Sequence, residues 1–311
     1  MEKLNRTSVT EFILTGLTEL PWLQKVLFVV IFVFYVVNIV SNLGIVTLVS
    51  RNTALQSPMY FFLANLSFID IFYSTVSIPK MLAGFFMENI ISFKGCITQL
   101  YFFHFLGCIE GILLAVMGYD RYVAICNPLQ YQIVMDKFTC ILLVFSSWIV
   151  GVFYSLTHSL MASQLPFCKV KKIKHFMCDV KPVLRLACAD TFLNEITVML
   201  VTGFIGMVTF FITVVSYVYI FMNLMKIHSV SGRSKAFSTC SSHITIVIFF
   251  FGTAMCTYLG PTSEGSIEKD KVAALLFTVV TPTLNPLIYT IRNQEVHRCL
   301  RKLFRKEKVW K

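Results

Sequence analysis

Charged side chains are scarce in this chain: Asp, Glu, Lys and Arg make up only 14% of its 311 residues. An ordinary soluble domain carries about 25% charged residues. The deficit is accompanied by a hydrophobic content of 56% and a mean hydropathy of +0.73. This composition argues against a soluble domain and indicates that lipid surrounds most of the chain.

Long stretches of the chain lack charge almost completely. A helix needs about 20 mostly apolar residues to cross roughly 30 Å of bilayer hydrocarbon. Seven stretches meet this requirement; five contain no charged residue, and two contain one acid each, Asp70 and Glu110. We therefore predict an all-α membrane protein in which residues 26–291 form a seven-helix bundle. The predicted spans are Val26–Ser50, Pro58–Pro79, Cys96–Tyr119, Phe138–Leu160, Ile196–Met225, Phe237–Leu259 and Val272–Ile291.

Three further features are missing from the sequence. The first 20 residues contain only short apolar runs, so no cleavable signal peptide is visible and the first span is expected to act as the insertion signal. No Gly/Ser linker or low-complexity run separates the spans, which predicts a single domain. No internal repeat is apparent and the number of spans is odd, which argues against the paired repeats of many secondary carriers.

Orientation must come from features other than the count of basic residues, which divide almost equally between the two sides. Asn5 begins an Asn-Arg-Thr glycosylation acceptor, which only a lumenal amino terminus can use. A Cys-rich loop at about 161–195 belongs on the oxidising outer side, and a basic tail at 292–311 suits an anionic inner leaflet. We therefore predict a multi-pass plasma-membrane protein with residues 1–25 outside the cell and the tail in the cytoplasm.

The net charge of +11 raises the question of nucleic-acid binding. The basic residues are dispersed among loops that the spans separate, so we predict membrane lipids, and no nucleic acid, as partners of the basic tail. Cys299 in this tail is either a free thiol or a site of acylation. Apolar residues recur around it at helical spacing and predict a short amphipathic helix at the inner interface: Val296, Leu300, Leu303 and Phe304.

Four cysteines gather at the outer side of the predicted bundle: Cys96, Cys168, Cys178 and Cys188. Two disulfides are the natural interpretation, and the spacing leaves three pairings open. Zinc is the competing interpretation, because His175 lies among these cysteines. The spacing is not that of a compact zinc finger, so we predict disulfides and no metal.

Acidic and amide side chains occur at mid-depth in several spans. Asp70 and Glu110 are expected to face the bundle interior, where Asn42 and Asn285 complete a polar cluster. Neighbouring carboxylates share a proton or a cation such as sodium. The alternative is that these groups only connect the helices through hydrogen bonds.

Asp120 and Arg121 form a charged pair at the inner end of the third span. If the inner helix ends move apart, Arg121 becomes exposed to a partner protein, and Asp120 holds it until then. An isolated arginine near an interface would instead be interpreted as a side chain that snorkels to the headgroups.

Several motifs in order resemble the signature set of odorant receptors, which are rhodopsin-like G-protein-coupled receptors. They are EFIL at 11–14, LQSPMYFFL at 55–63, DRY at 120–122 with CNPL at 126–129, KAFSTCSSH at 235–243 and PTLNPLIY at 282–289. The resemblance covers nearly the whole chain, as far as residue 293. No Ser/His, paired-Asp or His-Glu-x-x-His arrangement appears within the spans, so we predict no enzymatic activity, catalytic residue or cofactor.

The resemblance implies a function and a set of roles. An odorant binds among the outer halves of the helices, and a stimulatory, olfactory-type heterotrimeric G protein that raises cyclic AMP is engaged at the inner face, in cilia of olfactory sensory neurons. It also implies two disulfides, Cys96 with Cys178 and Cys168 with Cys188. The residues that it assigns to coupling and switching are Asp120, Arg121, Tyr122, Tyr217, Asn285, Pro286 and Tyr289.

The chain departs from the family pattern at three positions. Gly118 stands where Ala is usual, which loosens the third helix slightly. Phe251 stands where Tyr is usual and removes a hydroxyl from the pocket floor. Ser41 stands where Gly is usual, a small-for-small change.

An acid is also missing from the inner end of the sixth span, at 231–236, where many rhodopsin-like receptors hold the third-span arginine. Arg233 and Lys235 occupy this stretch instead, and cations cannot hold Arg121. We therefore expect the resting state to depend on Asp120 and on packing.

The outer halves of the helices offer a mostly apolar pocket with a few polar groups. Phe103 occupies the place where an amine receptor of this fold carries an acid, so we predict a small neutral ligand. The predicted lining residues are Phe103, His104, Gly107, Cys108, Val201, Thr202, Ile205, Phe251, Met255, Tyr258 and Thr278.

Two other functions remain open at this point. A rhodopsin-like receptor for a non-odorant metabolite in other tissues would use the same motifs. A proton-coupled transporter would use Asp70 and Glu110 as its relay.

Overall fold

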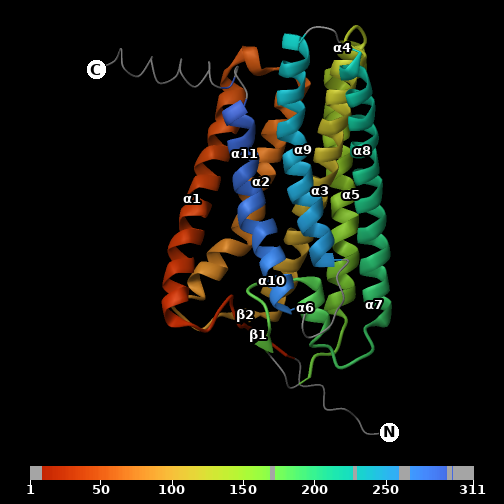
Figure 1. Cartoon of the computed structure of the whole chain (residues 1–311). Coiled ribbons are helices and arrows are strands. Elements are labelled where there is room, and N and C mark those ends of the chain that lie inside the picture. The colour runs from red at the N-terminus through yellow and green to blue at the C-terminus, as the bar shows by residue number, and fades with distance from the viewer. Residues whose placement is uncertain (1–8, 169–171, 227–229, 259–266, 293–295, 297–311) are drawn as a thin grey trace, which may run out of the picture.

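The computed structural model describes residues 9–168, 172–226, 230–258, 267–292 and 296, except for the side chains at 54, 230–239 and 290–292. Seven helical runs of membrane length cross it side by side (Figure 1). They are α1 (Pro21–Arg51), α2 (Pro58–Ala83), α3 (Phe93–Cys126), α5 (Lys137–Ser163), the continuous run Phe192–Met225, α9 (Val230–Tyr258) and the run Ile267–Arg292. The predicted seven-helix bundle is confirmed.

The helices extend beyond the predicted apolar spans, because helical hydrogen bonding continues through polar residues at the interfaces. α1 begins at Pro21 and α2 at Pro58, and proline suits the first helical turn. The Ser92 hydroxyl accepts the Gly95 N–H at the start of α3 (3.1 Å), and the Asp136 carboxylate accepts the Thr139 N–H at the start of α5 (2.8 Å). Local capping therefore sets these ends.

Two of the seven runs contain a π-helical turn. The fifth consists of α7 (Phe192–Thr197), the turn η2 (Val198–Thr202) and α8 (Gly203–Met225). The seventh consists of α10 (Ile267–Leu275), the turn η4 (Leu276–Val280) and α11 (Thr281–Arg292). Such turns add a residue to one helical turn and are frequent at functional sites.

A small sheet lies at one end of the bundle and was missed by the all-α prediction. β1 (Glu11–Leu14) is its central strand, antiparallel to β2 (Ile90–Ser92) and parallel to β3 (Lys172–Ile173). These strands have only two to four residues each, too few for an alternating pattern to emerge. The sheet joins the chain before α1, the α2–α3 connection and the long loop.

Three short helices complete the described elements: η1 (Thr53–Leu55), α4 (Tyr131–Val134) and α6 (Val180–Leu184). The first two lie at the end of the bundle opposite the sheet, which we call the inner end; the sheet marks the outer end (Figure 1). α6 belongs to the long loop at the outer end.

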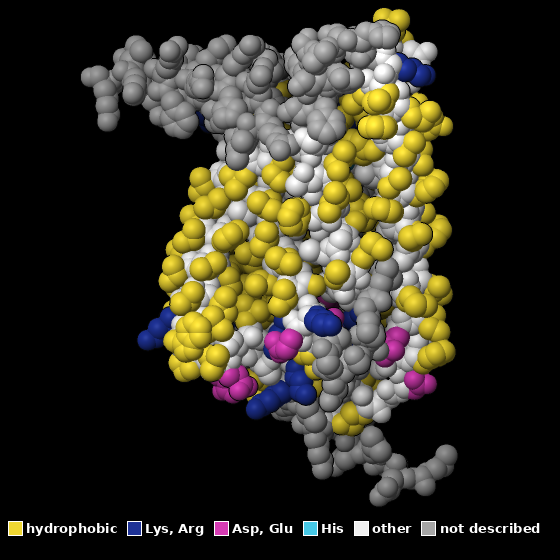
Figure 2. Space-filling view, in the orientation of Figure 1, with side chains coloured by type: hydrophobic (Ala, Val, Ile, Leu, Met, Phe, Trp, Pro, Cys, Tyr) yellow, Lys and Arg dark blue, Asp and Glu magenta, His cyan; other side chains and the backbone are white. Residues whose placement is uncertain are grey.

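α3 is the central helix of the bundle, because it packs against α2, α5, α8 and α9 and is buried along most of its length. The outward faces of α1, α5 and α8 carry large apolar side chains, such as Phe153 and Phe204, which are 67% and 71% exposed. Figure 2 shows hydrophobic side chains covering the flank of the bundle, with most of the acidic and basic ones that are visible lying at the outer end. This distribution is that of a helix bundle whose flank faces lipid.

The α3–α5 contact depends on Gly151. A Cβ atom added there would lie 2.9 Å from Ile109 Cγ1 and 3.2 Å from the Phe105 carbonyl oxygen. Such distances are too short, and the helices would have to separate. Small residues allow this close approach of membrane helices.

We expect Gly151→Ala to destabilise the purified protein by about 1–3 kcal/mol, the usual cost of overpacking. Gly44→Ala on α1 is the matched control, because nothing lies within 4 Å of the added Cβ there. The thermal midpoint in detergent measures both. Equal midpoints for the two variants would contradict the α3–α5 contact.

Candidate functional site

A cavity lies inside the outer half of the bundle, between α2, α3, α5, α8, α9 and the two π-turns. Its volume is about 90 Å³, below the roughly 300–1,000 Å³ of sites for drug-sized ligands. Its walls are mostly apolar and aromatic: Tyr73, Phe103, His104, Gly107, Cys108, Gly111, Ile112, Tyr154, Thr202, Ile205, Gly206, Thr209, Phe250, Phe251, Ala254, Tyr258 and Phe277.

Most of the predicted lining residues lie in this wall. Phe103, His104, Gly107, Cys108, Thr202, Ile205, Phe251 and Tyr258 do so. Val201, Met255 and Thr278 do not line it. Met255 is 48% exposed, and the Thr278 hydroxyl is buried and donates to the Ala274 carbonyl (2.7 Å). Val201 and Thr278 lie in the π-turns η2 and η4, where spacing rules for an ideal α-helix fail.

Aromatic residues that the sequence analysis missed form one side of the cavity. Tyr73 of α2 stacks on Phe103 with ring centroids 5.0 Å apart and meets Phe277 edge-on at 5.5 Å. Phe250 and Phe277 have centroids 5.0 Å apart. Phe251 lies beside Phe250 (5.3 Å), so a purely apolar contact occupies the place of the family's usual tyrosine.

A chain of polar side chains crosses the cavity wall. His104 Nε2 lies 3.1 Å from Asp179 Oδ1, and His104 Nδ1 lies 3.5 Å from the Tyr154 hydroxyl. The Tyr154 hydroxyl is 2.9 Å from Thr202 Oγ1, and Thr202 Oγ1 is 3.5 Å from His158 Nε2. The sequence signal for Tyr154 and His158 was available, since both are polar residues within an apolar span.

Asp179 brings a buried carboxylate to the outer end of this chain, which the sequence analysis did not foresee. Burial alone would raise its pKa, but the hydrogen bond and charge of His104, together with His175 and the Val180 N–H, lower the pKa below its usual value. The carboxylate is therefore ionised and accepts from His104 and from the Tyr258 hydroxyl (3.4 Å). Since its oxygens already accept hydrogen bonds from His104 and Tyr258, this carboxylate is not a free counter-ion for an amine.

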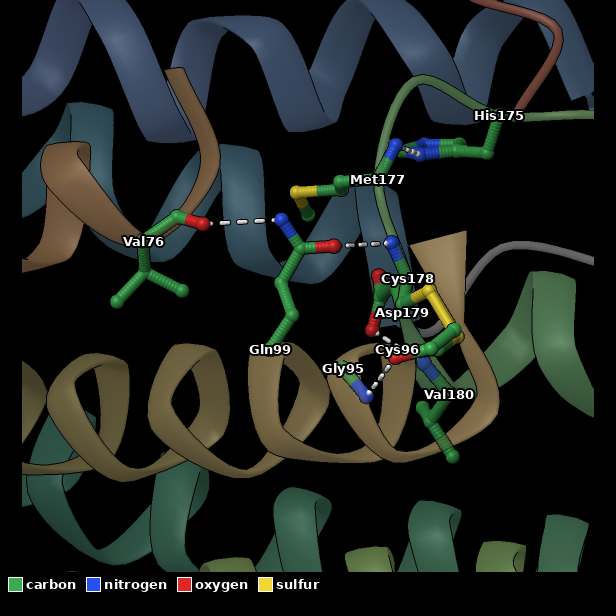
Figure 3. Close-up of a disulfide and its surroundings, with 10 residues drawn as sticks. Val76, Gly95, Cys96, Gln99, His175, Met177, Cys178, Asp179 and Val180 are labelled. Carbon is green, nitrogen blue, oxygen red and sulfur yellow. Dashed lines mark hydrogen bonds between the residues drawn. A yellow bond between two sulfur atoms is a disulfide. The ribbon is translucent and has the colours of Figure 1, made fainter. Parts of the chain in front are cut away.

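A disulfide fixes the position of Asp179. Cys96 at the start of α3 is bonded to Cys178, the residue before Asp179 (Figure 3). Gln99, one turn along α3, accepts the Cys178 N–H (2.9 Å) and donates to the Val76 carbonyl of α2 (2.9 Å). The long loop is thereby attached to two helices above the cavity.

The other cysteine pair in the long loop is Cys168 with Cys188. Both pairings agree with those that the resemblance implied, and they use the three sulfur ligands, Cys168, Cys178 and Cys188, that a zinc site with His175 would need. His175 is buried, which lowers its pKa to about 4, and its neutral Nδ1 accepts the Met177 N–H (3.3 Å).

The mid-depth polar residues meet between α2, α3 and α11. The Asn285 amide donates to Asp70 Oδ2 (3.0 Å) and to Glu110 Oε1 (3.2 Å), so both carboxyl groups share one donor. Glu110 Oε2 has no hydrogen-bond partner among the described residues. Asn42 donates to Asn38 and to the Pro282 carbonyl (3.2 Å), so it joins α1 to α11. It is connected to Asp70 only through the Asn38 amide, which donates to the Asp70 backbone carbonyl (3.3 Å).

At the inner end, the Asp120 carboxylate forms an ion pair with the Arg121 guanidinium, which we call the arginine lock. The Arg121 Nε donates to Asp120 Oδ2 (2.9 Å), and its terminal NH2 group makes a second bond to the same oxygen. The Tyr131 hydroxyl of α4 donates to Asp120 Oδ1 (2.8 Å), a partner that the sequence did not reveal. The side chains of 231–236 are outside the described set.

Other predicted switch residues surround this lock. The Tyr217 hydroxyl is 2.8 Å from His243 Nδ1, which joins α8 to α9, and the Tyr122 ring packs against Tyr219 (5.7 Å). Tyr289 is buried, and its hydroxyl has no partner among the described residues. Pro286 lies within α11 directly after Asn285.

Of the two small-residue departures, Gly118 leaves room for the usual alanine: an added Cβ would lie 3.5 Å from Thr213 and 3.6 Å from His243, ordinary contact distances. The Ser41 hydroxyl donates to the Val37 carbonyl within α1 (2.5 Å).

Asn5, Cys299 and the predicted tail helix lie outside the described residues, apart from Val296, which is buried.

Comparison with known proteins agrees with this geometry. Residues 31–307 match the family model described as olfactory receptor. Human Olfactory receptor 12D1 is 50% identical over 94% of this chain and 92% of its own length, and gorilla Olfactory receptor 1G1 is 46% identical over 97% of each chain. The fold resembles that of squid rhodopsin, with a TM-score of 0.72 at 16% identity over 92% of this chain and 86% of that one.

Proposed function

Because the chain belongs to the olfactory receptor family, a family of signalling receptors rather than enzymes, we propose that it is an odorant receptor. A small, neutral, volatile ligand binds in the outer cavity and activates a stimulatory, olfactory-type G protein that raises cyclic AMP. The observation that carries this proposal is the presence, in one bundle, of a mostly apolar cavity at the outer end and an ion-paired arginine at the inner end.

The chemistry of the cavity supports a neutral ligand with one polar group. Tyr154, Thr202 and Tyr258 offer hydroxyls, and His104 offers an imidazole, within a wall that is otherwise aromatic and aliphatic. Asp179 is the only carboxylate in the hydrogen-bonded chain, and His104 and Tyr258 already pair it. An alcohol, ether, ester or ketone satisfies such a site without an unpaired charge.

The cavity and the arginine are both on α3 but are too far apart for a ligand to touch Arg121. Gly107 lines the cavity, and Arg121 lies 14 positions later, about 21 Å along the helix axis. A conformational change must therefore connect the two sites. A ligand acts at this distance only if it binds the open inner state better than the closed one. Closed states are held by Asp120 with Arg121, and by Tyr217 with His243. In the open state Arg121 and Tyr122 contact the G protein, with Asn285, Pro286 and Tyr289 moving in α11.

The outer end then faces the exterior. The sheet lies at this end (Figure 1). The two disulfides join the start of α3 to the long loop and close the loop on itself at the same end, where an oxidising compartment maintains them. We place the receptor in the plasma membrane of olfactory cilia, with residues 1–25 extracellular and glycosylated at Asn5, residues 26–291 as the membrane domain, and 292–311 as a cytoplasmic tail on membrane lipids.

In the middle of the bundle, Asp70 and Glu110 share a proton or a sodium ion.

A second candidate function uses the same geometry. A receptor for a non-odorant metabolite has the same cavity and the same lock, and tissue expression distinguishes it. A proton-coupled transporter, by contrast, would not require Arg121.

A cyclic AMP reporter screen against a chemically diverse odorant panel tests the proposal. We expect at least one neutral odorant to raise cyclic AMP and Arg121→Ala to abolish the response at matched surface expression. Ligand-dependent nucleotide exchange on purified G protein excludes transport as the function. A response that survives Arg121→Ala would overturn the proposed coupling.

A further inference from the structure

A second hollow lies on the flank of the bundle, far from the outer cavity. Its volume is about 670 Å³, and it opens between the inner ends of α1, α2 and α5. Its wall is mainly apolar and includes Val46, Phe61, Phe68 and Ile141. Lys137 lies at its inner mouth. The described residues that form it take no part in the outer cavity or in the arginine lock.

The depth of this groove matches one leaflet of a bilayer. Along α2 its lining extends from Pro58 to Phe68, and ten residues of helix rise about 15 Å. That is half of the roughly 30 Å hydrocarbon thickness. The apolar side chains that line this groove make dispersion contacts with an acyl chain that lies in it, so the groove suits one lipid tail.

Polarity changes along the groove. The polar side chains of Ser50, Gln56 and Lys137 lie at the inner mouth, whereas Val46 and Phe68 lie deepest. Asn65 is the exception at intermediate depth, and its amide donates to the Phe61 carbonyl (2.8 Å). An occupant therefore needs an apolar tail and a polar head at the inner interface.

The charged side chains at the inner mouth determine which headgroup charge is favoured there. Lys137 is the one charged side chain in the lining, it is exposed, and it makes no ion pair among the described residues. Arg51 directly follows Ser50 and is also exposed. The only nearby acid in sequence is Asp136, whose carboxylate caps α5 by accepting the Thr139 N–H. The mouth thus carries a net positive charge where the inner leaflet is anionic.

We propose that this groove is a binding site for an anionic phospholipid of the cytoplasmic leaflet. One acyl chain lies along Phe61 and Phe68, and the headgroup phosphate and carboxylate lie at Lys137. The site rests on the proposed orientation, with the inner end in the cytoplasm, but not on any odorant.

The site also adjoins the inner lock. Met135 lines the groove, and it follows α4, whose Tyr131 donates to Asp120. Cys140 lines the groove as well, and its thiol lies 3.7 Å from the Met135 carbonyl. A bound lipid therefore braces the segment that holds Asp120.

Native mass spectrometry of the full-length receptor in detergent tests the site, with phosphatidylserine, phosphatidylcholine of the same acyl chains, and cholesterol as probes. We expect phosphatidylserine to bind about fivefold more tightly than phosphatidylcholine, the usual effect of one basic residue near a headgroup. Lys137→Glu removes this preference. Lys226→Glu, an equal charge change at an exposed lysine that ends α8 at the same end, leaves it intact.

A second variant locates the acyl chain. Ala64 lines the groove, and Ala64→Phe fills it and weakens both phospholipids about tenfold while the thermal midpoint without lipid stays within a few degrees of wild type. Equal binding of the two phospholipids by the wild type, or undiminished binding by Ala64→Phe, would overturn the proposal. Tighter binding of cholesterol than of phosphatidylserine would make the groove a sterol site and would also overturn it.

Discussion

Replacing Asp120 with Asn is expected to raise basal cyclic AMP by roughly tenfold at matched surface expression. In the structure this carboxylate accepts two hydrogen bonds from Arg121 and one from Tyr131. Hydrogen bonds to charged groups contribute about 1.5–3 kcal/mol, and a shift of about 1.4 kcal/mol changes an equilibrium tenfold. If the lock opposes opening, removing its charge increases the open population by this factor.

Two further variants separate the lock from general damage. Asp136→Asn changes an exposed acid near the same end of the bundle, keeps a side chain that caps α5, and leaves Arg121 untouched; we expect unchanged basal cyclic AMP. Tyr131→Phe removes only one donor to Asp120 and should raise basal cyclic AMP less than Asp120→Asn does. Basal cyclic AMP that is the same in Asp120→Asn and wild type would show that packing alone keeps the receptor closed.

The sequence was most informative where one residue type conflicts with its surroundings. Arg121, Asp70 and Glu110 are charges in apolar spans, and such residues are expensive enough in lipid to stand out without a structure. The structure indeed places Asp70 and Glu110 on a common donor, Asn285. Positions on α3 such as His104 and Cys108 were also accessible, because regular helical spacing projects them to one face.

The remaining features depend on interactions that have no local signature. The π-turns η2 and η4 change the direction in which the side chains of Val201 and Thr278 point around the helix. Nothing in the local composition marks a π-turn. Tyr131 reaches Asp120 only because α4, in the connection between α3 and α5, packs against α3. Asp179 arrives at the cavity through a disulfide between residues 82 positions apart. Side chains positioned by such long-range contacts become visible only in three dimensions.

Replacing Asp179 with Asn is expected to weaken the response to an activating odorant by about 10- to 100-fold in half-maximal concentration. The change removes the charge that pairs His104 and weakens the bond from the Tyr258 hydroxyl. Both of these partners line the cavity, and leaving buried polar groups unpaired costs about 1–3 kcal/mol. We therefore expect His104 and Tyr258 to leave the positions that a ligand requires. Odorant dose–response curves in the cyclic AMP assay measure the effect.

Asp190→Asn is the matched control for this variant. Asp190 lies in the same long loop but is exposed, and its carboxylate accepts only the Phe192 N–H (2.9 Å) among its described hydrogen bonds. The control should keep wild-type potency, whereas Asp179→Asn should lose potency yet retain its surface expression, because the Cys96–Cys178 disulfide still holds the loop. Wild-type potency in Asp179→Asn would mean that the polar chain from His104 to Thr202 positions itself without the loop. The aromatic wall around Tyr73 and Phe277 would then be the part of the cavity that recognises the ligand.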